Sequence, residues 1–339
     1  MPHHRKQVCF YAPVPDKSYF HYNEFYNVDR RILEDLGFEV TLENSLAGLC
    51  LRPDLWFIWW WTRAAPWTLR AQVTGSPLVI TGVFNLDLPL PPSGFRFRPM
   101  WQQMLIRSTL RTASANVFVS RQEYERMTSL FSITRPSYIP LTVDTSLYQP
   151  GDRDREPLVV TVAWMEGDNS LRKGVPQVLQ IFSQLRKRMP SARLVIAGER
   201  GSAFASLEKL AAELNCADAI DFPGRISTED KIRLLQRASL YLQPAIFEGF
   251  GVAVAEAMSC GVPVLTSPAG ALPELVGDSN LTIALEDSAR WLEASVQLMQ
   301  DRELWKERSR SGRERIEREF SYERRLEGLR SLFRDLRVL

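Results

Sequence analysis

Two carboxylates and two glycines lie close together in one short stretch of the chain, Tyr241–Pro263. Glu248 and Glu256 are eight positions apart in a mostly apolar segment. A buried carboxylate without hydrogen-bond donors is costly, so each acid is expected to meet donors, and sugar hydroxyls are such donors. Gly249 and Gly251 leave bare backbone that a ligand can approach closely. The stretch therefore predicts a site for a ligand rich in hydroxyl or phosphate groups.

The residues around these groups predict a strand, a tight turn and a helix. Ala238–Leu242 is apolar and compatible with a strand, and Val252–Met258 is an almost wholly apolar helix that Gly261 and Pro263 end. Glu256 lies on that helix, where it can take a two-hydroxyl unit such as a ribose edge. The alternative is an ordinary core turn with one capping acid and one solvent-facing acid, which a lone Gly-x-Gly turn would favour.

A longer ordered pattern surrounds this turn. It consists of Glu248-Gly249-Phe250-Gly251, Glu256-Ala257, Gly261-Val262-Pro263-Val264 and Pro273-Glu274-Leu275-Val276. The pattern resembles the E-x7-E signature and its flanks in the retaining glycosyltransferases of family 4. That resemblance implies the GT-B fold, with two Rossmann-like α/β domains facing across a cleft that closes over the donor. It covers the chain from Leu158 to about Tyr322 and the earlier part only in outline.

Length and composition agree with two ordinary globular domains. The chain has 339 residues, of which 45% are hydrophobic and 24% charged. Its net charge of +2 gives no reason to expect a nucleic-acid partner. Four scattered cysteines without a C-x-x-C pair indicate reduced thiols, and no signal peptide follows the charged start, so we expect a cytoplasmic protein. Three histidines, His3, His4 and His21, give no zinc-site spacing, and no metal is expected.

Strands and helices alternate along the chain, which predicts parallel sheets wound with helices. Residues 1–150 form the expected acceptor domain, and residues 151–320 form the nucleotide-sugar donor domain, with Gly151–Pro157 as linker. Residues 321–339 are expected to form a helix, Glu323–Leu336. The resemblance implies that this helix crosses back to the first domain. Its charges, Arg325 among them, look like a solvated face. Neither domain has a G-x-G-x-x-G sequence, which argues against a dehydrogenase.

The acceptor side is less clearly marked. Leu55–Trp61 is a run of apolar and aromatic residues, and its first interpretation is a buried parallel strand. At its end, Trp60 and Trp61 with Arg63 beyond them are expected to emerge at the cleft and stack on a sugar acceptor. Gly82, Val83 and Phe84 occupy the position where many family members have a histidine. Only His21, in the first loop, remains to take that role.

A basic segment, Phe95–Arg111, combines four arginines with apolar residues. Two interpretations are open. It is either a surface helix whose apolar side packs on the sheet, or an amphipathic helix that rests on an anionic membrane, which would put the protein on the inner face of the membrane.

By resemblance, the donor site uses residues from four places in the second domain. Lys173, before Gly174, matches the family lysine that neutralises the departing diphosphate, and Arg172 is expected to replace a family arginine that is absent after the first strand. Glu248 holds the donor sugar, and Glu256 holds the ribose. The remaining donor-binding residues, near sugar, phosphate and base, are Gly249, Phe250, Gly251, Val252, Gly224 and Arg225.

The resulting prediction is a retaining glycosyltransferase that uses a UDP- or GDP-sugar and no cofactor or metal. Substitution on one face of the sugar, with the leaving phosphate helping to deprotonate the acceptor, is implied by the resemblance. The acceptor is a glycan, a lipid-linked or a small-molecule hydroxyl. A non-catalytic binding module with the same fold is the alternative, because the expected arginine and histidine are missing. A phosphorylase or epimerase of the same shape is a third possibility.

Overall fold

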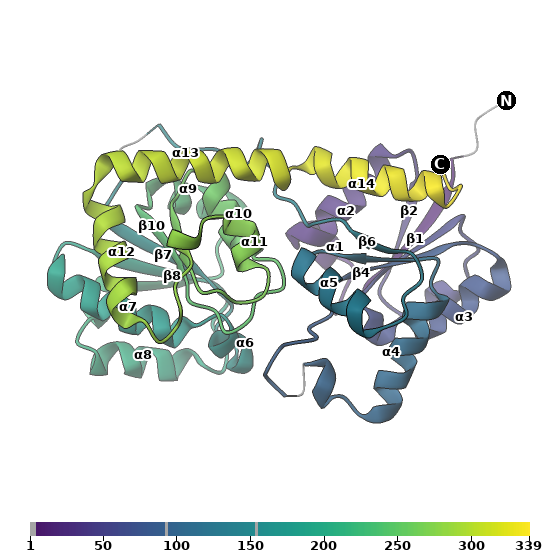
Figure 1. Ribbon diagram of the computed structural model, residues 1–339, viewed down its shortest axis with the longest axis horizontal. Coiled ribbons are helices and arrows are strands. Elements are labelled where there is room, and N and C mark those ends of the chain that lie inside the picture. Colours follow the sequence, from purple (N-terminus) through teal and green to yellow (C-terminus); the bar gives the residue numbers. More distant parts are fainter. Residues whose placement is uncertain (1–4, 92–93, 153–154) are drawn as a thin grey trace. The chain divides into compact units, whose positions relative to one another are not determined.

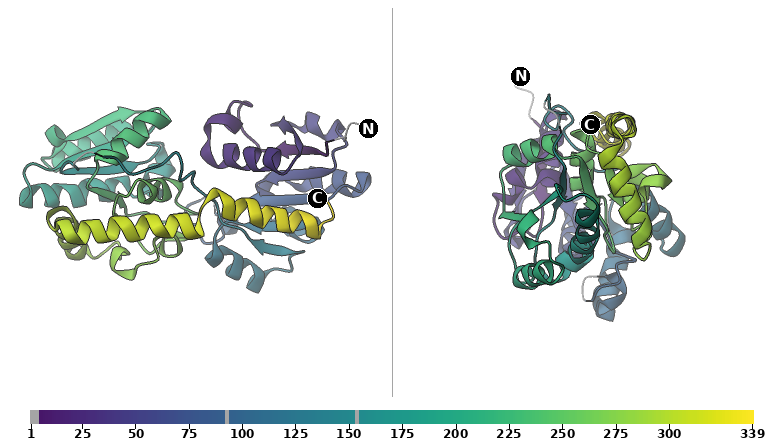
Figure 2. Two further views of the ribbon diagram at one scale, coloured as in Figure 1. Left: turned by 90° about the horizontal axis from the view of Figure 1, so that it is seen from above. Right: turned by 90° about the vertical axis from the view of Figure 1, so that its left-hand side faces the viewer.

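The computed structural model describes residues 5–91, 94–152 and 155–339, and the chain divides into two compact units (Figure 1). The N-terminal unit comprises Met1–Thr142 with Tyr322–Leu339, and the C-terminal unit comprises Val143–Ser321. Each unit contains one parallel sheet covered by helices (Figure 2), as the alternating pattern predicted. In a parallel sheet the carboxyl ends of all strands lie at the same edge, and ligands bind there.

The N-terminal unit has six strands in the order β2-β1-β3-β4-β5-β6. The strands are β1 Gln7–Tyr11, β2 Glu39–Glu43, β3 Leu55–Trp59, β4 Leu78–Gly82, β5 Ala115–Phe118 and β6 Pro136–Tyr138. Its helices are α1 Tyr19–Tyr22, α2 Glu24–Asp35, α3 Ala65–Thr74, α4 Met100–Thr112, α5 Arg121–Leu130 and α14 Tyr322–Asp335. Three 3₁₀ turns, Leu46–Cys50, Trp61–Arg63 and Phe95–Phe97, connect them. Every residue of β3 is buried, which confirms the predicted interior strand.

Helix α14 is tied to the N-terminal unit by a buried ion pair. The Arg325 guanidinium donates to Asp29 through Nε (2.6 Å) and Nη2 (2.8 Å), and its Nη1 donates to the carbonyl of Ile139 at 2.9 Å. Trp59 Nε1 donates to the same carboxylate at 3.0 Å. The expectation that Arg325 lies on a solvated face is therefore wrong. A buried charge persists because each polar group finds a partner.

The C-terminal unit has five strands in the order β11-β10-β7-β8-β9. They are β7 Leu158–Val162, β8 Arg193–Ala197, β9 Ile220–Gly224, β10 Leu240–Gln243 and β11 Val264–Thr266. The helices are α6 Gly167–Arg172, α7 Val175–Arg188, α8 Phe204–Glu213, α9 Thr228–Arg237, α10 Val252–Ser259, α11 Leu272–Val276, α12 Ser288–Gln300 and α13 Arg302–Glu319. Leu179, Phe182 and Trp291 fill the core between the sheet and helices α7 and α12.

The boundary between the units falls after Thr142 rather than after Pro150. The reason is Tyr148, which is fully buried in the C-terminal unit. Its backbone carbonyl accepts hydrogen bonds from Ser259 Oγ (2.7 Å) and Arg313 Nη1 (3.1 Å). The residues before the expected linker are thus part of the second unit, and the linker itself, Gly151–Pro157, lies partly outside the described residues.

Candidate active site in the C-terminal unit

The predicted strand, turn and helix are confirmed as β10, the turn after it and α10. Gly251 precedes the helix with φ +99°, a left-handed conformation that favours glycine. A Cβ at this position would lie 3.0 Å from Leu275 and 3.1 Å from Leu272, so the turn is also tightly packed. Phe250 is buried edge-on against Phe320, with ring centroids 5.6 Å apart. The turn is therefore held at a fixed place at the carboxyl edge of the sheet, with Gly249 and Gly251 both buried.

Glu248 lies in this turn and meets two cations from the end of α6. Lys173 forms a hydrogen-bonded ion pair with one carboxylate oxygen, and Arg172 Nη1 lies 3.8 Å from the other. Burial alone would raise the pKa of Glu248, but the charges of Lys173 and Arg172 outweigh it and hold the pKa below its usual value. Burial lowers the pKa of Lys173, while the Glu248 charge opposes that shift. The acid is ionised at neutral pH.

Neighbouring side chains fix the two cations. Arg172 donates to the carbonyl of Phe247 at 3.1 Å and to Asn169 Oδ1 at 2.8 Å. The side-chain amide of Gln243, at the end of β10, donates to the carbonyl of Lys173 at 2.8 Å. The strand thus holds the lysine backbone beside the turn that carries Glu248.

Glu256 lies on the second turn of α10 and is 2% exposed. One of its oxygens accepts from Tyr148 Oη at 2.8 Å and from Lys231 Nζ at 2.6 Å. The same ammonium lies 5.2 Å from the centre of the Tyr148 ring. Helix α9 and the segment before the linker thus both contribute to this second pair.

Each buried acid therefore has a lysine of its own chain as a donor, where ligand hydroxyls were expected. Lys231 and Tyr148 were not predicted as partners of Glu256. No local spacing links Lys231 or Tyr148 to Glu256, since they come from separate elements that only the tertiary fold brings together. A ligand at this site has to share these donors or replace them.

Gly224 ends β9 at the same edge of the sheet, and Arg225 follows it. Gly224 has φ +78°, and its carbonyl accepts from the Gly198 N–H at 2.9 Å. Arg225 is exposed. Arg200, which the sequence reasoning did not single out, comes from the end of β8 and donates to the Phe222 carbonyl at 2.5 Å. Trp164, which stands where the family arginine was expected, is 51% exposed after β7.

The residues expected to face the acceptor lie at the carboxyl edge of the other sheet. His21 is exposed on α1, and Arg63 is exposed after β3. Trp60 is half-buried, adopts φ +76° and donates through its indole nitrogen to Tyr26 Oη at 2.7 Å. Trp60 and Arg63 follow β3, and His21 lies on the first helix after β1, the strand that pairs with β3.

Trp61 is not available to an acceptor, contrary to expectation. It is 2% exposed, stacks on Phe118 with centroids 5.1 Å apart, and donates to Asn116 Oδ1 at 2.8 Å. The positive φ of Trp60 reverses the chain, and the following 3₁₀ turn directs Trp61 back into the core. Phe84, in the position of the family histidine, is also buried in this aromatic cluster.

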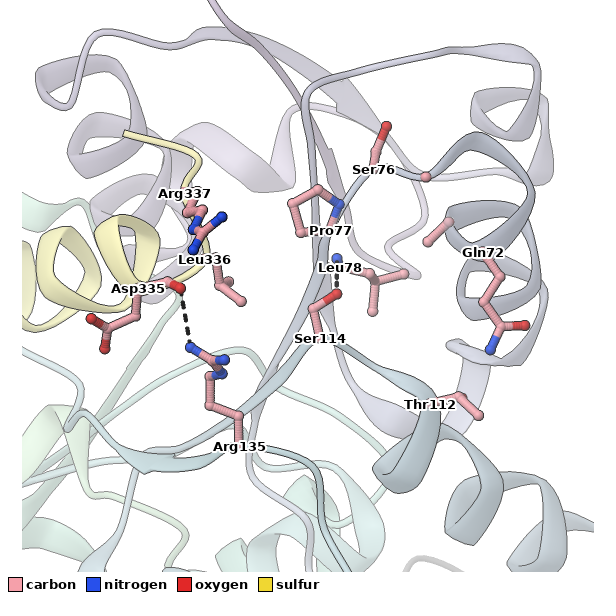
Figure 3. Close-up of a pocket in the computed structure, with 12 residues that line it drawn as sticks. Gln72, Ser76, Pro77, Leu78, Thr112, Ser114, Arg135, Asp335, Leu336 and Arg337 are labelled. Atoms are coloured by element: carbon pink, nitrogen blue, oxygen red, sulfur yellow. Dashed lines mark hydrogen bonds between the residues drawn. The ribbon is translucent and has the colours of Figure 1, made fainter.

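Two further observations concern other places where a ligand could bind. Within residues 5–91, 94–152 and 155–339, no three histidine, cysteine or acidic side chains gather as a metal site would need; His3 and His4 lie outside those ranges. A cavity of about 440 Å³ in the N-terminal unit is lined by Leu78, Ser114 and Arg135 (Figure 3). It lies where strands β4 and β5 begin, and so at the opposite edge of the sheet from the one where ligands bind in such folds.

Comparison with known proteins gives one family. Residues 152–315 match the family described as "Glycosyl transferases group 1". An MMP alpha-(1->4)-mannosyltransferase of Mycolicibacterium hassiacum is 36% identical over 140 residues, which are 41% of this chain and 33% of that protein. A GDP-mannose-dependent alpha-(1-6)-phosphatidylinositol monomannoside mannosyltransferase of Mycobacterium tuberculosis is 26% identical over 298 residues, 81% of this chain and 74% of that protein.

Solved structures share the fold over nearly the whole chain. Sucrose-phosphate synthase from Thermosynechococcus elongatus has a TM-score of 0.81 at 19% identity, covering 98% of this chain and 99% of that one. Anabaena HepE, solved with UDP and glucose, has a TM-score of 0.76 at 15% identity, covering 97% and 100%. At these identities the likeness establishes the fold alone.

Proposed function

We propose that this chain is a family 4-like glycosyltransferase, because residues 152–315 match the group 1 family and the fold is shared with GT-B structures, and that it transfers a sugar from a nucleotide diphosphate with retention of configuration. The donor is a UDP- or GDP-sugar. The acceptor is a hydroxyl of a glycan, a lipid-linked sugar or a small molecule. Transfer needs no metal ion, because Lys173 and Arg172 supply the charge that meets the diphosphate.

The observation that carries this proposal is the pair of buried acid–lysine contacts on either side of Gly251. Glu248 and Lys173 lie before α10, and Glu256 with Lys231 lies on its second turn. The first N–H groups of α10 have no partner within the helix and suit a phosphate. Sugar, diphosphate and ribose thus each have a group of the right chemistry at one edge of the sheet.

Each group has one role in the proposed reaction. Lys173 and Arg172 bind the diphosphate and stabilise the negative charge that builds on it as the glycosidic bond breaks. Glu248 accepts hydrogen bonds from hydroxyls of the donor sugar, and Glu256 accepts those of the ribose. A phosphate oxygen of the leaving group takes the proton of the acceptor hydroxyl, whose oxygen forms the new bond on the same face. The proton and the bonding electrons balance without a further reactant.

Among donors, GDP-mannose is the first to test. The mycobacterial relative carries GDP-mannose in its name, and HepE was solved with UDP, so both bases stay in the comparison. We propose a mannosyl donor because several of the proteins that match this chain are mannosyltransferases.

Calorimetry tests the donor site directly. UDP, GDP, ADP and their sugars are titrated into the wild type and Glu256→Ala with a chelator present. Selective binding of one nucleotide that Glu256→Ala weakens, and that the exposed control Glu208→Ala leaves unchanged, supports the proposal. Equal affinity in Glu256→Ala removes the ribose role, and binding only after a divalent metal is added contradicts metal independence.

A second function, a binding module without catalysis, is favoured by one observation. Trp164 stands exposed after β7 where relatives of this type were expected to have an arginine. Such a module binds the nucleotide sugar but leaves it intact beside every acceptor offered. Release of free nucleotide, followed by chromatography, distinguishes the two functions. Turnover that depends on inorganic phosphate indicates a phosphorylase instead.

A further inference from the structure

A stripe of large apolar side chains is exposed on and just before α4. The side chains are Phe97, Met100, Trp101, Met104 and Leu105, which we call the α4 patch. Their positions recur at three- and four-residue intervals, so along the helix they share one face. Met100, Trp101 and Met104 are 77%, 62% and 63% exposed. Of fourteen exposed large apolar residues in the described part of the chain, five belong to this patch.

The other face of α4 already holds the helix on the N-terminal unit. Ile106, Thr109 and Leu110 are buried there. The interpretation that the apolar side of this helix packs on the sheet therefore applies only to its second half. The residues of the α4 patch do not take part in this packing. Exposed apolar surface gathered in one place marks an interaction site.

The charged residues within the segment that carries the patch all have one sign. Residues 95–112 contain four arginines and no acidic residue or lysine: Arg96, Arg98, Arg107 and Arg111. From outside the segment, the Asp87 carboxylate lies 3.9 Å from Arg96. Arg107 lies over the ring of Phe131, 5.4 Å from its centre, with an exposed position on the helix. An apolar stripe bordered by arginines is complementary to a surface that is apolar inside and anionic outside.

We propose that the α4 patch docks this chain on an anionic lipid bilayer. The apolar side chains enter the boundary between headgroups and acyl chains, where tryptophan is favoured, and the arginines meet lipid phosphates. A second copy of the chain fits less well as the partner. In a symmetric dimer the four arginines beside one α4 patch would face the same four arginines of the other copy, and these like charges repel each other. The helices of the described residues are all too short or too polar to span a bilayer.

Vesicle flotation of the full chain, without donor or acceptor, tests the proposal independently of catalysis. Vesicles are made of phosphatidylcholine alone or mixed with phosphatidylglycerol. The wild type is expected to float with the anionic vesicles. The double variant Trp101→Ser/Met104→Ser is expected to lower partitioning about tenfold, because it removes buried apolar area. Arg107→Gln/Arg111→Gln is expected to lower it about 25-fold, since each arginine near such a surface contributes about fivefold.

Matched controls separate the patch from general stickiness. Leu69 and Val73 on α3 are 64% and 72% exposed in the same unit, and Leu69→Ser/Val73→Ser should leave flotation unchanged. Lys187→Gln/Arg188→Gln on α7 removes two exposed charges from the other unit and should also leave it unchanged. Circular dichroism and thermal unfolding verify that each variant is folded.

Four outcomes overturn the proposal: no flotation, equal flotation with neutral vesicles, patch variants that float like the wild type, or controls that lose flotation as fully as the patch. Sedimentation that shows a dimer abolished by Met104→Asp assigns the patch to a second copy instead. Loss of flotation in both patch variants, with folded proteins and intact nucleotide binding, supports the membrane contact whether or not the proposed transfer reaction is found.

Discussion

The carboxyl edges of the two sheets use acids in opposite ways. In the C-terminal unit, Glu248 and Glu256 are each held by a flexible lysine. In the N-terminal unit, Glu123 accepts instead from the backbone N–H groups of Phe84 and Asn85, each at 2.8 Å. A lysine can turn toward a phosphate when one arrives, whereas a backbone N–H cannot leave its loop. The comparison indicates that the acids at the carboxyl edge of the C-terminal unit can exchange their partners. The acid at the carboxyl edge of the N-terminal unit instead fixes a loop.

The largest expected effect on catalysis is that of replacing Lys173. Lys173→Met removes the charge that faces the diphosphate and should reduce turnover by about 10² to 10³-fold, as loss of a group that stabilises the transition state does. Steady-state kinetics of the purified variant measures it. Lys209→Met, an exposed lysine of the same unit, serves as control. Full activity in Lys173→Met would mean that this pair is structural, and the contrast between the two edges would fail.

The N-terminal unit also has a buried ion pair, between Arg325 and Asp29. Breaking it is expected to reduce stability instead of activity. Arg325→Met leaves the Asp29 carboxylate buried without its cation and should lower the free energy of unfolding by about 3 to 5 kcal/mol. Chemical denaturation measures the change. Nucleotide binding by the C-terminal unit should survive under native conditions. If nucleotide affinity falls in a variant that remains folded, the two units are not separable in the way the comparison requires.

Glu123 gives the comparison a dependence on pH. Burial raises the pKa of Glu123 to about 7, against backbone hydrogen bonds that lower it. The folded state then holds a proton that the unfolded state releases, so the contribution of this group to stability falls as pH rises from about 4.5 to about 7, by about 3 kcal/mol. Thermal unfolding across that range should show a smaller decline in Glu123→Gln than in the wild type. Identical slopes in the two proteins would rule out this proton.

The smallest effect is expected from Lys231. Lys231→Met leaves Glu256 with the Tyr148 hydroxyl alone, and donor affinity should fall about tenfold, or about 1.4 kcal/mol. Calorimetry with the preferred nucleotide sugar measures it. Lys306→Met removes an exposed lysine of the same unit as a control. Tighter donor binding in Lys231→Met would show that the lysine competes with the ribose for Glu256 instead of orienting that acid.

Local pattern was enough to predict much of this fold. The strand, turn and helix around Gly251 were predicted close to their observed bounds, because Gly251, Gly261 and Pro263 mark where the helix begins and ends. Helices α12 and α13 were not predicted, although Asp287 and Asp301 cap their first turns. Dense charges hid the single buried apolar residue of α13, Ile316, whereas α12 has only two charged residues and its apolar spacing was overlooked.

The site was predictable only in part, for a physical reason. Lys173 and Glu248 were both singled out, but their contact joins two loops 75 positions apart. Lys231, Tyr148 and Arg325 were missed because a charged or phenolic side chain looks solvated in sequence until the fold supplies its partner. The prediction that Trp61 faces an acceptor was also wrong. The positive φ of Trp60 directs the Trp61 indole into the core, and the sequence does not show that backbone angle. The roles of the site residues remain predictions that the variants above test.

The ion pair between Arg325 and Asp29 also bears on the order in which the chain acquires its structure during synthesis. Asp29 emerges from the ribosome long before Arg325, and the whole C-terminal unit is made in between. Until α14 arrives, the N-terminal sheet must either leave that carboxylate in water or bury it without its cation. The C-terminal unit, whose sequence is continuous, can be complete first. A stalled or truncated chain that ends before residue 322 is therefore expected to expose its N-terminal unit to proteases while its C-terminal unit is already resistant.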